Sequence, residues 1–168
     1  MLPEIFTIIL SLRNVVQPTT ASPTSAGDVG TVPTKEELWT IHKAKWDTFI
    51  GNISPSFIGY EMVYQKNCFC IPDMKLPYRV SVNKDSLVSD IKHVDSGNPA
   101  ENSIVIANML TVEKAFQVIQ DAWAAAAPNV TVVYNEDYGH PAYVYIDKSA
   151  RIRDEEYSFT IQNVTLVG

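Results

Sequence analysis

Hydrophobic residues recur with a helical period in two stretches of the chain and alternate with polar residues in several others. A period near 3.6 predicts an amphipathic helix, and strict alternation predicts a strand with one buried face. The pattern predicts helices over residues 34–49 and 111–126, and strands over residues 57–70, 78–82, 87–94, 130–134, 143–146 and 156–166.

Capping signals mark the ends of both predicted helices. Thr34 and Glu37 form the capping-box pattern, a hydroxyl residue followed three positions later by a glutamate. Thr111 is a second hydroxyl N-cap, and Pro128 stops the helix that follows it. The first helix carries one apolar stripe, which we expect to face the core; its members are Trp39, His42, Trp46 and Phe49.

The predicted elements follow the order helix, three strands, helix, three strands. Residues 77–90 align without a gap with residues 141–154, which favours an internal repeat. The fold expected from this order is α+β: an antiparallel β-sheet with two α-helices packed on one face, built as a tandem αβββ-αβββ pair.

The N-terminal part differs in composition from the rest of the chain. Residues 1–16 contain the short apolar stretch 5–12, too short to span a bilayer, which indicates either a secretory signal or a disordered start. Residues 17–33 are rich in Ser, Thr, Pro and Gly and predict a linker. Residues 34–168 are expected to form a single α+β domain.

Charge and motif content limit the classes of function. The formal net charge is −6, and the basic residues are scattered, which argues against binding nucleic acid. The chain has no nucleophile-elbow motif and no glycine-rich phosphate loop. We therefore expect no cofactor and assign no catalytic residues.

Cys68 and Cys70 are the two cysteines of the chain, and they flank Phe69. In a strand, residues i and i+2 point to the same face, so the two sulfur atoms are expected to lie side by side. Three interpretations remain open: a disulfide bond, a pair of packed free thiols, and a soft-metal site completed by His140.

Tyrosines are frequent in the predicted strands, and an open sheet face could present them to a partner. Ordinary cross-strand pairing is the alternative interpretation. The candidate partner face consists of Tyr60, Tyr64, Tyr138, His140, Tyr143 and Tyr145. Three Asn-x-Ser/Thr sequons, at Asn52, Asn129 and Asn163, are candidate glycosylation sites if the protein is secreted.

The spacing of several motifs resembles the DUF6174 family, which consists of small domains of unknown function. Cys68-Phe69-Cys70, the later Tyr138-Gly139-His140-Pro141 and the run 154–156 carry the resemblance, which extends over about residues 36–166. Members of the family often have Gly-Tyr-Pro where this chain has Gly139-His140-Pro141. The resemblance implies an extracytoplasmic location and domain limits, but it implies no catalytic residues.

Together these observations predict a secreted, non-enzymatic domain that binds a protein partner through the open face of its sheet. The alternative is a redox-active or soft-metal-binding protein that works through Cys68 and Cys70. Secretion would favour the disulfide form of these cysteines, because disulfide bonds persist in oxidising compartments.

Overall fold

A computed structural model describes residues 32–52, 56–149, 151–152 and 155–168. The predicted signal-like start, most of the predicted linker and Asp154 lie outside these residues. Residues 33–168 form one compact unit. Its elements are α1 (Lys35–Gly51), β1 (Gly59–Cys68), the 3₁₀ turn η1 (Pro72–Lys75), β2 (Tyr78–Asn83), β3 (Val88–His93), α2 (Ser103–Ala107), α3 (Val112–Ala124), β4 (Asn129–Tyr134), β5 (Pro141–Asp147) and β6 (Tyr157–Val167).

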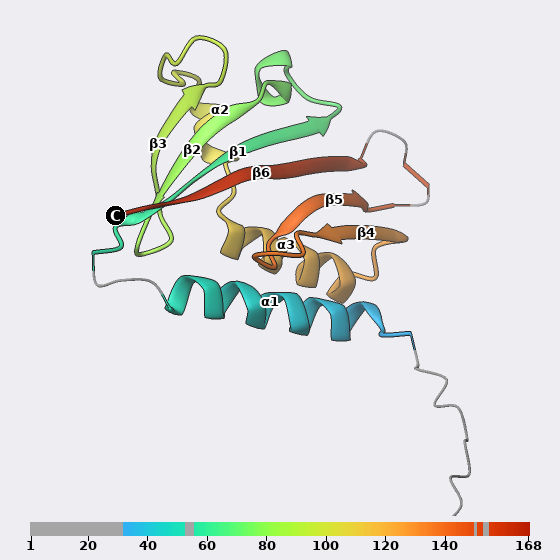
Figure 1. Cartoon of the computed structure of the whole chain (residues 1–168). Helices are drawn as coiled ribbons and strands as arrows, with labels where there is room; N and C mark the ends of the chain where they lie inside the picture. The colour runs from blue at the N-terminus through green and yellow to red at the C-terminus, as the bar shows by residue number, and fades with distance from the viewer. Residues whose placement is uncertain (1–31, 53–55, 150, 153–154) are drawn as a thin grey trace, which may run out of the picture. The chain divides into compact units, whose positions relative to one another are not determined.

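The strands form one antiparallel, six-stranded sheet in the order β3-β2-β1-β6-β5-β4. Figure 1 shows α1 and α3 on the same face of this sheet, with α3 next to β4 and β5. The α+β class and the antiparallel sheet are therefore confirmed. The two predicted αβββ repeats occupy different places in the sheet. β1, the first strand of one repeat, lies at the centre of the sheet, whereas β4, the first strand of the other, forms one edge.

Local sequence signals account for the helix ends. Thr34 caps α1 with both hydrogen bonds of the capping box, and the side chain of Thr111 accepts a hydrogen bond from the backbone N–H of Lys114. Two short elements were not expected from the sequence. η1 lies between the predicted strands 57–70 and 78–82, and α2 precedes α3 in the long connection after β3. Both are too short to show a helical period.

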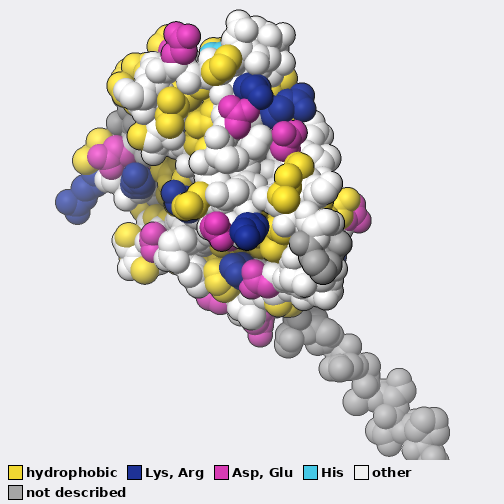
Figure 2. All heavy atoms as spheres, turned by 90° about the vertical axis from the view of Figure 1, so that its left-hand side faces the viewer, with side chains coloured by type: hydrophobic (Ala, Val, Ile, Leu, Met, Phe, Trp, Pro, Cys, Tyr) yellow, Lys and Arg dark blue, Asp and Glu magenta, His cyan; other side chains and the backbone are white. Residues whose placement is uncertain are grey.

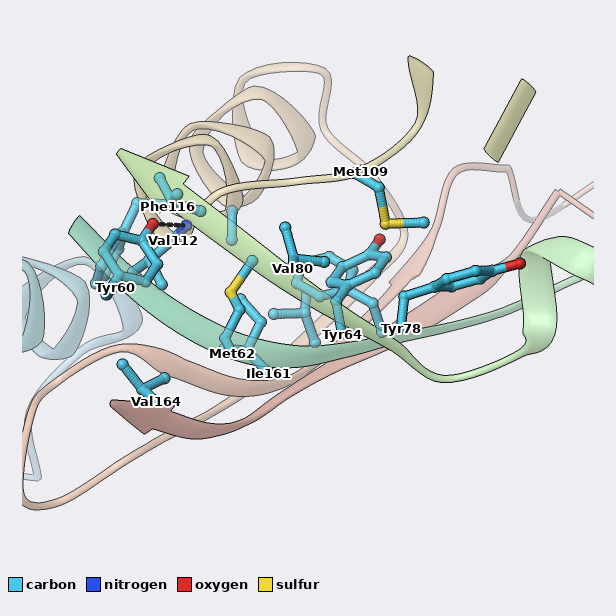
Figure 3. Packing of buried hydrophobic residues seen from close by; sticks show 14 of the residues in the cluster. Tyr60, Met62, Tyr64, Tyr78, Val80, Met109, Val112, Phe116, Ile161 and Val164 are labelled. Carbon is cyan, nitrogen blue, oxygen red and sulfur yellow. Dashed lines mark hydrogen bonds between the residues drawn. The ribbon is translucent and has the colours of Figure 1, made fainter. Parts of the chain in front are cut away.

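The core lies between the helices and one face of the sheet. Alternation places Tyr60, Met62 and Tyr64 of β1 on this face, and Figure 3 shows them beside Val80 of β2 and Ile161 of β6. The opposite face carries the intervening residues of the same strands. Figure 2, which views the left-hand side of Figure 1, shows acidic and basic side chains interspersed with apolar ones.

Both edges of the sheet are partly covered. The backbone N–H of Ala100 donates to the carbonyl of Ile91, so the loop after β3 folds back on that edge strand. At the other edge, the ammonium group of Lys35 lies 3.5 Å from the carbonyl oxygen of Val130 in β4. Such partial cover is one way in which an edge strand avoids pairing with another chain. Among the described helices, none is long and apolar enough to cross a membrane.

Candidate functional site at the disulfide end of the sheet

Cys68 and Cys70 are joined by a disulfide bond, with their Cα atoms 5.3 Å apart. β1 ends at Cys68, so the chain leaves the strand at the first cysteine and turns back to bring the second within bonding distance. Of the three interpretations of this pair, the structure has the disulfide. The bond lies at the end of the sheet where Cys68 is paired with Tyr157 of β6.

The disulfide holds Phe69 in solvent. Phe69 is 81% exposed, and the side chains of Ile71 and Leu76 nearby are also exposed. We call residues 68–76 the disulfide tip. One strongly exposed apolar side chain inside the disulfide-closed turn and two partly exposed ones after it therefore lie in this short segment. The sequence pattern did not reveal this, because Phe69 falls within the predicted strand 57–70, whereas β1 ends at Cys68.

Contacts to the sheet fix the base of the disulfide tip. Met74 is buried in the core, and the hydroxyl of Tyr78 donates a 2.9 Å hydrogen bond to the carbonyl of Asp73. The side chain of Gln65 donates a 3.0 Å hydrogen bond to the carbonyl of Lys75. These contacts and Pro72 at the start of η1 restrict the backbone. The backbone of the disulfide tip is therefore restrained, because η1 is attached to the sheet through these contacts.

A hollow of about 190 Å³ lies beside the tip and extends onto the open face of the sheet. Phe69 forms part of its lining, and Tyr145 of β5 forms another part. The pKa of Tyr145 is raised by desolvation and by the nearby carboxylates of Asp147 and Glu156. The phenol of Tyr145 is able to donate a hydrogen bond to a partner.

The six residues of the candidate partner face lie in different environments. Tyr143 and Tyr145 are half-buried on the open face, opposite Val133 and Thr131 of β4. Tyr138 is exposed in the turn between β4 and β5, where its ring stacks on Phe49 at 4.4 Å.

Tyr60, Tyr64 and His140 are 2%, 1% and 3% exposed, so they are not part of an exposed face. Tyr60 and Tyr64 point into the core (Figure 3), because alternation along β1 places them on the helix-covered side. Of the predicted partner face, the tyrosines of β5 and the turn residue Tyr138 are the ones that reach solvent.

His140 and the cysteines lie at opposite ends of the sheet. His140 directly precedes β5, whereas Cys68 is level with Tyr157, which pairs with Ile146 near the end of β5. Both sulfur atoms are bonded to each other, so they offer no thiolate to a metal. Within the described ranges, no group of three or more histidine, cysteine or acidic side chains is arranged to hold a metal ion. The Cys68, Cys70 and His140 set is therefore not brought together.

The histidines of the helix-covered face contribute to packing. His42 stacks on Tyr134 with ring centroids 4.4 Å apart, as its place on the apolar stripe predicted. His140 packs against Trp46, and burial lowers the pKa of His140 to about 4. Burial also lowers the pKa of His42. Both imidazoles are therefore mostly neutral at pH 7.

The three sequon asparagines are all exposed. Asn52 follows the last residue of α1, Asn129 begins β4, and Asn163 lies at an irregularity in β6 with a φ of 51°. The remaining residues of the Asn52 sequon lie outside the described part of the chain. Exposure makes each asparagine accessible to a glycosyltransferase, and glycosylation stays a prediction.

The fold and the site define a small α+β domain with a disulfide-closed projection at one end of its sheet. The model of the family of unknown function DUF6174 matches residues 36–166, and the chain belongs to this family. No curated protein and no solved structure matches the chain.

Proposed function

We propose that this protein is a secreted, non-enzymatic binding domain that docks a protein partner with its disulfide tip and the adjoining open face. The observation that carries the proposal is Phe69, a large apolar side chain that is 81% exposed on a covalently closed turn. Exposed apolar patches with polar rims are typical of interaction surfaces. The exposed sequon asparagines and the disulfide support a secretory location.

The proposal rests on two energetic terms: the free energy gained when a partner buries Phe69, and the small loss of conformational freedom that this binding requires. Removing a phenylalanine side chain from water contributes about 1.5–3 kcal/mol. Ordering flexible side chains and loops at an interface costs about 0.5–1.5 kcal/mol for each side chain. The disulfide and the anchored η1 reduce that cost for Phe69, which makes it suited to act as a central anchor. The expected partner offers an apolar pocket for this ring.

The chemistry around the anchor defines the rim of the interface. Tyr145 lies in the hollow beside Phe69, and the Asp147 and Glu156 carboxylates act electrostatically on its phenol. Ile71 and Leu76 extend the apolar surface on the side of η1. A complementary partner surface has an apolar centre and hydrogen-bond acceptors or basic groups opposite the tyrosine and the carboxylates.

Site-specific photo-cross-linking tests the proposal. A photoreactive phenylalanine analogue replaces Phe69 in one sample and Leu87 in a matched control. Leu87 is also exposed, but it lies in the turn after β2, at the opposite end of the sheet. In extracellular fluid from the source organism, we expect one discrete cross-linked protein for position 69 and none for position 87.

The purified partner then provides a quantitative measurement. Phe69→Ala is expected to weaken binding by about 2 kcal/mol, close to thirtyfold, as is typical of a hot-spot residue. Leu87→Ala is expected to leave the affinity unchanged. Equal cross-linking at both positions, or equal affinity of the two variants, would contradict docking through the tip.

The second candidate function is thiol–disulfide exchange at Cys68 and Cys70. The observation that favours it is the position of the disulfide beside an open hollow, where an incoming thiolate has access to Cys68. Attack by such a thiolate forms a mixed disulfide and releases the other cysteine as a thiolate. Alkylation after equilibration in glutathione buffers measures the reduction potential. A potential below about −300 mV is typical of a structural bond and would exclude the redox role.

A further inference from the structure

Two lysines converge on one aromatic ring at the disulfide end of the sheet. Lys66 belongs to β1 and Lys148 follows the last residue of β5, yet each ammonium nitrogen lies 5.1 Å from the ring centroid of Tyr157. Strand register explains the meeting, because Lys66 pairs with Phe159 and Ile146 pairs with Tyr157. Because β6 lies between β1 and β5, the two ammonium groups reach the ring of Tyr157 from the strands on either side of it.

Neither lysine of this pair forms an ion pair with a described residue. The chain as a whole is acidic, with a formal net charge of −6. Within the described residues, the ion pairs of the protein join other groups, and neither Lys66 nor Lys148 lies within 4.0 Å of a carboxylate. The pKa of Lys66 is lowered, first by burial and then by the charge of Lys148. A nearby anion would oppose both effects, because it favours the charged form of the ammonium group.

An apolar cavity of about 330 Å³ begins at the same ring. Tyr157 and Lys148 line one side, and Ile146 of β5 adds an apolar wall. The other walls come from α3 and the residues just after it, namely Val118, Ala122, Ala125 and Ala127. Pockets for small molecules range from about 300 to 1,000 Å³ and are mostly apolar with a few polar groups, so this cavity has the size and character of a small one.

Charge sets the direction in which a ligand would lie. Asp121 is the acidic residue on the cavity lining, and its carboxylate accepts a 2.8 Å hydrogen bond from the side chain of Gln117. The C-terminal end of α3 also carries partial negative charge. Both features repel an anionic group near α3. A negative group is favoured at Lys148 and Lys66, and an uncharged aliphatic chain is favoured along α3.

We infer that Lys66, Lys148 and Tyr157 form a binding site for a small aliphatic carboxylate. Its carboxylate lies at the ammonium group of Lys148, which lines the cavity, and its hydrocarbon chain occupies the cavity beside α3. Lys66 adds positive charge from the other strand that flanks Tyr157. The argument does not depend on docking through the disulfide tip, because Phe69 does not line this cavity. Phe69→Ala is therefore expected to leave binding of the carboxylate unchanged.

Calorimetric titration of the full chain with sodium octanoate tests the inference. We expect saturable binding of one octanoate, with acetate and octanol each at least about tenfold weaker, because acetate lacks the chain and octanol lacks the charge. N-acetyl-leucine represents the alternative source of an aliphatic carboxylate, the C-terminal end of a peptide. Tighter binding of octanoate would support a free fatty acid as the ligand, and tighter binding of N-acetyl-leucine would support the C-terminal end of a peptide.

Variants distinguish binding at this site from general electrostatic attraction between octanoate and the lysines of the protein. Lys148→Met is expected to weaken octanoate binding about tenfold, because it removes the ammonium group at which the carboxylate lies. Lys114→Met is the matched control: it removes a lysine from the exposed face of α3, away from the cavity lining. We expect its affinity to stay within about twofold, since screening weakens interactions between distant charges.

A substitution in the cavity tests the position of the ligand's hydrocarbon chain without altering the charge of the protein. Ala122→Phe fills the space beside α3, and we expect it to abolish octanoate binding while the amide NMR spectrum of the sheet is retained. Unchanged octanoate affinity in Ala122→Phe or in Lys148→Met would overturn the inference. It would also be overturned by the absence of saturable binding up to ~10 mM octanoate, a concentration at which even a millimolar site fills.

Discussion

Removing one hydroxyl, in the variant Tyr60→Phe, tests how the core joins β1 to the two long helices. The hydroxyl of Tyr60 accepts a 2.9 Å hydrogen bond from the backbone N–H of Val112, shown as the dashed line in Figure 3. It donates a second, also 2.9 Å long, to the carboxylate of Glu113. The indole of Trp46 in α1 donates to the other oxygen of the same carboxylate at 3.1 Å.

The expected cost of Tyr60→Phe follows from these contacts. Val112 is the first residue of α3, so its N–H has no partner within the helix, and the residue is fully buried. An unpaired buried N–H costs about 1–3 kcal/mol, and a hydrogen bond to a charged group contributes about 1.5–3 kcal/mol. The two costs overlap, so we expect the free energy of unfolding to fall by about 2–4 kcal/mol.

Tyr64→Phe is the matched control. Tyr64 is as deeply buried in the same strand, but its hydroxyl has no hydrogen-bond partner among the described residues. Removing it eliminates a desolvation cost, so we expect stability to be unchanged or to rise by about 1 kcal/mol. The two substitutions delete the same atom, yet only Tyr60→Phe is predicted to lower stability.

Equilibrium unfolding in urea measures both variants. The midpoint of Tyr60→Phe is expected to fall at an unchanged m-value, and its melting temperature to drop by about 6–15 °C. A stability loss in Tyr64→Phe equal to that in Tyr60→Phe would refute the reasoning. It would mean that removing a buried hydroxyl is costly whether or not the hydroxyl has a partner.

Two further predictions concern the segment that packs on α1. The unfolded chain binds a proton at His140 near pH 6.5, whereas the folded protein binds it only near pH 4, so stability is expected to fall by about 3 kcal/mol as the pH drops through this window. His140→Tyr is expected to lose this part of the pH dependence of the free energy of unfolding, measured in urea. An unchanged dependence of that free energy on pH would contradict the prediction. Gly139 has a φ of 84°, and a Cβ there would lie 3.0 Å from the backbone nitrogen of Trp46 and closer still to another backbone atom of α1. Gly139→Ala is therefore expected to cost about 2–4 kcal/mol, whereas Gly97→Ala, with a φ of 70° and open space around it, should cost about 1–2 kcal/mol for the backbone alone; equal losses of melting temperature would exclude the clash.

Several elements of this fold could be predicted from local signals. The capping box at Thr34 and Glu37 marked the start of α1, and the cap at Thr111 marked the start of α3. Alternation located all six strands to within a few residues of their observed bounds. These signals are readable because caps and periodic burial depend on residues close together in the sequence.

The candidate sites were less accessible to sequence reasoning. Cys68 and Cys70 were recognised as a unit, but the exposure of Phe69 depends on where the chain leaves β1. Lys66 and Lys148 carried no recognisable pattern, because strand pairing through Tyr157 is what makes them neighbours. Tyrosines were assigned to an outer face as a group, yet alternation along β1 directs Tyr60 and Tyr64 inward.

The sequence by itself determined the α+β class and the position of the cysteine pair, since each depends on periodicity or short spacing. Only the tertiary structure decided the strand order β3-β2-β1-β6-β5-β4 and the direction of each tyrosine. The tertiary structure also placed Lys66, Lys148 and the cavity next to the ring of Tyr157. The physical reason is that strand pairing and helix docking are long-range choices, made by the total burial and hydrogen bonding of the folded chain.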